Sequence, residues 1–154
     1  METPKGTSRR SEGGHVITFE VLGNPVTQGS GKSIKDRAGN ARYIQDHRGP
    51  LMNWRASIAQ AAQVAADGVF AERGVPVWVN VTFRLQRPKS APRRVIRPTT
   101  KPDVDKMARA GLDALTGVIF ADDSQVVSLH VQKEYAGEAQ APGAVFVVRF
   151  GDGP

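Results

Sequence analysis

The stretch Lys101–Gln125 reads KPDVDKMARAGLDALTGVIFADDSQ, with an Asp-x-Asp pair near its start and an acidic pair near its end. On a helical wheel of about 100° per residue, one side of the segment between the two pairs carries Val104, Met107, Ala108, Gly111, Leu112 and Leu115. The other side carries Asp105, Lys106, Arg109 and Asp113. The spacing predicts an amphipathic helix whose apolar side packs and whose acidic side faces outward.

Periodic patterns on both sides of this stretch predict the rest of the fold. Two-residue alternation predicts strands over residues 15–23, 75–85, 126–135 and 143–150. Residues 50–67 are alanine-rich with helical spacing, and the glycine-containing residues 27–45 predict a hairpin with arms at 33–35 and 42–44. Two helices and a mixed sheet predict an α/β or α+β domain of two layers.

Length and composition limit the class of protein. The 154 residues fit one domain, expected over residues 15–151, after a disordered tail over residues 1–14. We expect an intracellular, cytoplasmic protein, since no apolar run is long enough to cross a bilayer and the start resembles no secretory signal. The chain has no cysteine, so any metal must bind oxygen or imidazole ligands.

The charge is basic and unevenly distributed. Lys and Arg number 21 against 15 Asp and Glu, and no acidic residue lies between Arg73 and Pro102. From the proline-rich segment in this interval we select as candidate contacts to a polyanionic partner Arg84, Arg87, Lys89, Arg93, Arg94, Arg97 and Lys101. Lys32 and Lys35 of the hairpin join them. A basic loop is either a solvated surface or a phosphate-binding one, and its position directly before the acidic cluster favours the second interpretation.

The acidic residues suggest a metal site. In an extended segment Asp103 and Asp105 project to the same side and can face one cation. Asp105 is alternatively a helix N-cap, which leaves Asp103, Asp122 and Asp123 unexplained. Clustered carboxylates repel one another unless a cation or basic neighbours neutralise them. Magnesium or manganese suits several hard oxygen ligands, and neutralisation by Lys106 and Arg109 is the alternative.

The same stretch resembles the RusA family of Holliday junction resolvases. The resemblance rests on Asp-x-Asp, a helix containing Asp-Ala-Leu, and the following Asp-Asp-x-Gln-Val. It implies that Asp103, Asp105 and Asp123 are the essential metal-binding aspartates, with Asp122 and Asp113 at further acidic positions. It also implies a magnesium-dependent homodimer, with manganese as a substitute ion, that cuts four-way DNA junctions by paired nicks.

Two positions depart from the family pattern. Lys106 stands where the family has asparagine, and Arg109 stands where it has a functional lysine. Arginine can stabilise a charged transition state but does not readily exchange a proton, so proton transfer would pass to Lys106 or to metal-bound water. Arg109 can also simply bridge Asp105 and Asp113. Besides the nuclease, the sequence allows two alternatives. A non-catalytic DNA-binding protein would explain the basic loop but leave the clustered acidic residues without a role. A structural protein would explain neither the basic loop nor the acidic residues.

Overall fold

The computed structural model describes residues 13–29, 31–45 and 48–151. Its elements in chain order are β1 (His15–Leu22), β2 (Gly31–Lys35), β3 (Ala41–Gln45), α1 (Arg48–Ala66), β4 (Val77–Leu85), α2 (Val104–Leu115), the 3₁₀ turn η1 (Asp123–Gln125), β5 (Val126–Tyr135) and β6 (Gly143–Phe150). The predicted order of strands, hairpin and helices is confirmed. The expected tail over residues 1–14 lies outside the described residues except for its last two glycines, so its boundary stays a prediction.

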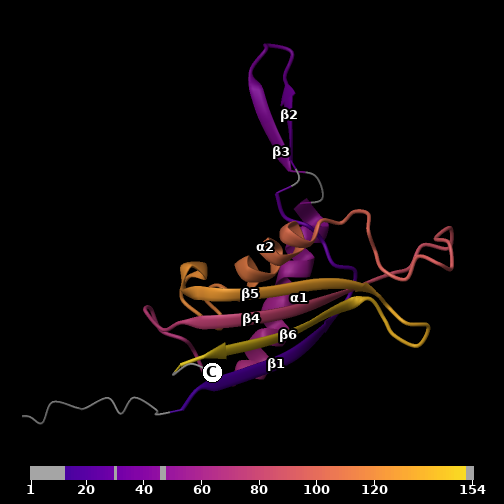
Figure 1. The fold of residues 1–154 in the computed structure, drawn as a ribbon. Coiled ribbons are helices and arrows are strands. Elements are labelled where there is room, and N and C mark those ends of the chain that lie inside the picture. Colours follow the sequence, from indigo (N-terminus) through magenta and orange to yellow (C-terminus); the bar gives the residue numbers. More distant parts are fainter. Residues whose placement is uncertain (1–12, 30, 46–47, 152–154) are drawn as a thin grey trace, which may run out of the picture.

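Four strands form one mixed sheet in the order β1-β6-β4-β5. β6 runs antiparallel to β1 and β4, whereas β4 and β5 are parallel. Parallel neighbours need a crossover connection, and α2 lies in the connection between these two strands. Figure 1 shows the four strands side by side, with α1 crossing one face and α2 next to it. This is the two-layer α+β fold expected from the sequence.

The core lies between the sheet and the two helices. β1 buries Ile17, Phe19 and Val21 and exposes the residues between them, as the alternation predicts. Phe146 of β6 stacks on Phe19, with ring centroids 4.9 Å apart. A Cβ atom on Gly111 of α2 would lie 3.1 Å from the Phe146 ring, so the missing side chain allows the helix to approach the sheet closely. This packing fixes where α2 holds its polar residues.

The opposite face of the sheet carries a charged pair. Arg84 of β4 is only 8% exposed, and its Nη2 donates to Glu20 Oε1 of β1 over 2.7 Å. Leu22 on the same face of β1 is 62% exposed. This face therefore combines an ion pair with exposed apolar side chains.

β2 and β3 form a separate two-stranded antiparallel sheet. Its strands contain the arms predicted at residues 33–35 and 42–44. Figure 1 shows this hairpin projecting away from the four-stranded sheet, above the end of α2. Within the described residues, neither α1 nor α2 has the length and apolar character needed to span a membrane.

Candidate nuclease site

The acidic site is organised by α2 and by the residues directly before it. Met107, Ala108, Ala110, Gly111, Ala114 and Leu115 are buried, which confirms most of the apolar side of the predicted helix. Asp103 is the N-cap, with extended φ of −74° and ψ of 134°, and Asp105 lies in the first turn. The expectation that Asp103 and Asp105 share an extended segment is therefore wrong, and so is the alternative that Asp105 is the N-cap. Because α2 begins at Val104, the extended backbone ends at Asp103, and the two aspartates do not lie on one side of an extended segment.

Asp103 faces a basic neighbour. Its side chain makes no capping hydrogen bond, and its Oδ2 lies 3.4 Å from Lys106 Nζ. The two side chains are 47% and 36% exposed, and a pair so open to water contributes little stability. Asp103 therefore remains accessible to a ligand, with Lys106 as a partner that solvent or an ion can replace.

Asp105, Arg109 and Asp123 line one cleft of about 490 Å³ beside α2. The apolar part of its wall is formed by Val104, Ala108, Leu112, Leu129 and Val131. In the part of the chain that the structure describes, no ion pair joins Arg109 to Asp105 or to Asp113, so the proposed bridge between these helix residues is not formed. The guanidinium group is left to act within the cleft. Asp113, half-buried further along α2, is not among the cleft residues.

The second acidic pair divides into two roles. Asp122 caps η1, with its Oδ1 accepting from the backbone N–H of Ser124 over 2.9 Å. Hydrogen bonds from Ser124, through its side chain and then its backbone, lower the pKa of Asp122. Asp123 is the first residue of η1 and is exposed to the cleft. The structure thus gives Asp122 a local structural task and leaves the carboxylate of Asp123 available.

Gln125 holds this turn in place, and sequence reasoning assigned it no role. Its Oε1 accepts from Asp122 N over 2.9 Å, and its Nε2 lies 2.7 Å from Glu72 O and 3.1 Å from Val75 O. The side chain is buried, so these bonds fix η1 on the loop between α1 and β4. The sequence signal for this role was a single glutamine directly after an acidic, polar stretch.

Lys133 of β5 is a second residue that the sequence did not identify. Its Nζ donates to Thr100 O over 2.6 Å and to Pro102 O over 3.0 Å. These carbonyl groups belong to the segment that leads into Asp103. The lysine therefore fixes the start of the acidic site to the sheet.

The candidate DNA contacts differ in their environments. Arg84 is paired with Glu20 on the far face of the sheet. Arg87 donates to the carbonyl oxygens of Val95 and Pro92, each over 2.7 Å, and thereby organises the loop before α2. The candidates whose side chains are exposed are Lys35, Lys89, Arg93, Arg94, Arg97 and Lys101. Lys32 belongs to β2, but its side chain lies outside the described part of the structure.

A divalent ion would find an open site here. Among the described residues, no three His, Asp or Glu side chains gather around one point. Magnesium commonly binds one or two carboxylates and completes its coordination with waters and substrate phosphate oxygens. Asp105 and Asp123 in one cleft, with Asp103 exposed nearby in the sequence, fit that kind of site and do not form a closed metal cage.

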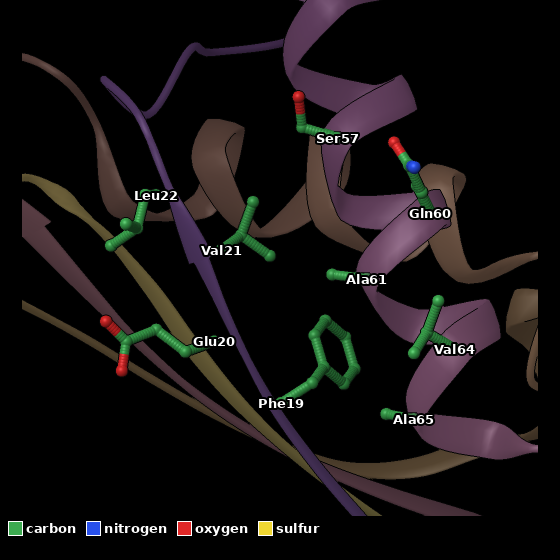
Figure 2. Close-up of a pocket in the computed structure, with 9 residues that line it drawn as sticks. All are labelled: Phe19, Glu20, Val21, Leu22, Ser57, Gln60, Ala61, Val64 and Ala65. Carbon is green, nitrogen blue, oxygen red and sulfur yellow. The ribbon is translucent and has the colours of Figure 1, made fainter.

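A second pocket, of about 540 Å³, lies between β1 and α1, at the sheet edge opposite β5. Figure 2 shows Phe19 and Val21 pointing toward the helix, whereas Glu20 lies on the other side of the strand. The wall on the helix is mostly small and apolar, with Ala61, Val64 and Ala65. This pocket has no group of acids and bases for catalysis, so the cleft beside α2 is the candidate site.

Comparisons with known proteins agree with this assignment. Residues 23–143 match the family model described as endodeoxyribonuclease RusA. The chain is also 33% identical over 130 residues to YqaN, an uncharacterized protein of Bacillus subtilis (strain 168), covering 79% of this chain and 89% of that protein. The matched span contains both acidic pairs, α2 and the basic loop, and the chain belongs to the RusA endodeoxyribonuclease family.

Proposed function

We propose that this protein is an endonuclease that cuts four-way DNA junctions by metal-dependent phosphodiester hydrolysis, with a role in DNA recombination and repair. The observation that carries the proposal is the cleft in which Asp105 and Asp123 lie with Arg109. Carboxylates and a guanidinium in one open cleft suit a phosphate substrate whose charge must be balanced as it reacts. Membership of the RusA family supports DNA as that substrate.

Asp105 and Asp123, which line the same cleft, would hold magnesium or, as a substitute, manganese, and Asp103 would supply a further carboxylate at the start of α2. When bound, such an ion lowers the pKa of a coordinated water and polarises the phosphate. Arg109 is always charged and donates in a fixed geometry, so it stabilises negative charge on the phosphate but does not act as a base. Lys106 already neutralises part of the charge of Asp103, and we assign it a supporting electrostatic role.

The exposed basic residues bring the DNA to this cleft. Arg93 and Arg94 are exposed on the loop that ends directly before Asp103, and Arg87 gives that loop a defined shape. Phosphate oxygens bound there would lie along the path of the chain into α2. Affinity would therefore come mainly from the loop, whereas chemistry would come from the cleft.

We further propose that the active form is a homodimer. One chain offers one such cleft among its described residues, and paired nicks at symmetric positions need two clefts related by a two-fold axis. Sedimentation at micromolar concentration tests this proposal. A monomer with full paired cutting would contradict it.

Cleavage of a labelled four-way junction and of a matching linear duplex, with and without magnesium, tests the activity. Asp103→Asn and Asp123→Asn should lose cleavage, because each removes a charged ligand at nearly constant size. Their affinity for the junction without metal should stay level or rise, because a repulsive charge has been removed. Asp113→Asn is the matched control and should be milder.

Two results would contradict the proposal. Near wild-type cleavage by Asp123→Asn would show that the acids serve only structure. Junction binding without cleavage by the wild type in magnesium or manganese would instead favour a non-catalytic DNA-binding protein.

A further inference from the structure

The described side chains of the β2–β3 hairpin lie outside the hydrophobic core. Every one of them, from Ser33 to Arg42, is exposed, and the core cluster contains none of these residues. Figure 1 shows it standing clear of the helices and the four-stranded sheet. An isolated two-stranded hairpin is only marginally stable in water, so this element would gain order from contact with a partner.

The exposed charges of the hairpin favour a polyanionic partner. Lys35, Arg37 and Arg42 are basic and exposed. The acidic side chain at the turn, Asp36, is used locally, because its Oδ1 accepts from Ala38 N and Asn40 N, each over 2.9 Å. Because three basic side chains outnumber this one carboxylate, the described surface of the hairpin is net positive.

Among the described side chains of the hairpin, one large apolar residue interrupts this basic surface. Ile34 is 46% exposed and lies directly opposite Arg42 in the strand register. An apolar side chain beside basic ones is the combination that DNA-bending proteins insert between base steps, while the basic residues hold the phosphates. The feature therefore points to a nucleic acid whose bases are accessible.

The base of the hairpin adjoins the candidate nuclease site. The backbone N–H of Gln28 donates to Lys106 O in the first turn of α2 over 3.1 Å. A Cβ at Gly29 would lie 3.0 Å from Nη1 of Arg109, so the chain entering the hairpin passes directly beside the guanidinium of the cleft. DNA bound by the hairpin would thus be continuous with DNA bound at the cleft.

We propose that the β2–β3 hairpin recognises the branch point of the DNA, with Ile34 against an exposed base-pair face and Lys35, Arg37 and Arg42 on the adjoining phosphates. A two-stranded ribbon fits the width of a DNA groove. At a branch point the base stack is already interrupted, so the apolar side chain enters without separating stacked bases, whereas in a linear duplex it must separate them. The hairpin thereby distinguishes branched from linear DNA, which deepens the proposed function and rests on it.

Binding without metal tests the proposal, with fluorescence anisotropy on a four-way junction and on a linear duplex of the same arm sequence. Ile34→Ser should lower the preference for the junction by about tenfold, roughly the value of partly burying one aliphatic side chain. Its affinity for the linear duplex should not change. Val16→Ser is the matched control, because Val16 is also an exposed aliphatic residue on a strand, 60% exposed, but lies on β1. It should leave both affinities unchanged.

A fluorescent base analogue next to the branch point provides a second readout. The wild type should change its fluorescence on binding, and Ile34→Ser should not, even at saturating protein. An Ile34→Ser protein that keeps both the preference and the fluorescence change overturns the role of the hairpin. A wild type that binds junction and duplex equally also overturns it, whereas a wild type that does not cleave the junction in magnesium or manganese overturns the proposed function, so the two failures are distinguishable.

Discussion

Gly29→Ala offers a way to move Arg109 without changing it. Gly29 has φ of +93°, and a Cβ there would lie 3.0 Å from Arg109 Nη1, closer than ordinary contact at 3.4–4 Å. The atom in the way is the end of a flexible side chain, so the guanidinium will yield and the backbone will not. The substitution should therefore displace the charge at the cleft by a few tenths of an ångström or more.

Two effects of this substitution can be separated by their sizes. Alanine in a left-handed conformation costs roughly 1–2 kcal/mol of folding stability. A misplacement of about 1 Å can cost up to a hundredfold in rate, so for a shift of a few tenths of an ångström we expect cleavage to fall by up to about tenfold. Gly74→Ala is the control, since Gly74 has φ of +84° and nothing lies within 4 Å of the added Cβ. Both variants should lose similar stability, and only Gly29→Ala should lose activity.

The assay is single-turnover cleavage of a four-way junction, together with thermal unfolding of each variant. In an Arg109→Ala background, adding Gly29→Ala should lower the rate no further, because the group that it displaces is already absent. Equal losses of activity in the Gly29 and Gly74 variants would refute the reasoning. So would an undiminished effect of Gly29→Ala in the Arg109→Ala background.

Three further predictions concern binding and folding. Replacing Arg93 and Arg94 by Ala should reduce the slope of log junction affinity against log salt by an amount that corresponds to about two phosphate contacts. An unchanged slope would mean that the loop serves only solubility. Gly143→Ala should cost more than about 3 kcal/mol in denaturant unfolding, because its Cβ would meet the backbone carbonyl of Val21, which cannot yield. Asp122→Asn should lower the unfolding temperature at neutral pH. The pKa of Asp122 is lowered in the folded state, so its ionised form stabilises the fold above pH 3.8. This stabilisation is lost as the pH falls through the folded-state pKa, and the difference between the variant and the wild type should therefore vanish in acid.

The helices and strands could be predicted because the spacing of apolar residues along the sequence follows which positions are buried. Alternation in β1 separates Ile17, Phe19 and Val21, which are buried, from the exposed residues between them, and the wheel of α2 placed Met107 and Leu115 on its apolar side. The side of each helix and strand that faces the core follows from such patterns, since each inward position must be apolar. Both acidic pairs could likewise be identified as the region of the candidate site, and their role stays a prediction.

The detailed geometry of the site could not be predicted in this way. Whether Asp103 and Asp105 share a side depends on the residue at which α2 begins, and sequence signals place helix ends only to within one or two residues. Arg84 counted as a free charge because its partner, Glu20, lies far away in the sequence. Gln125 and Lys133 bind backbone carbonyl groups, which any residue provides, so no residue type identifies their partners.

The placement of Lys133 also affects which changes in length the protein can tolerate. β5 follows Asp123 directly at one end and, through Lys133, holds the carbonyl groups of Thr100 and Pro102 near the other. The strand thus sets the distance between the two acidic segments, with a fixed rise of about 3.3 Å per residue. Insertions in the loop before Thr100 leave that distance unchanged, because Lys133 holds the end of the loop that leads into Asp103. One residue added within β5 before Lys133 would turn the lysine to the other face of the sheet. Relatives of this chain should therefore vary in the length of the loop and keep the length of the strand.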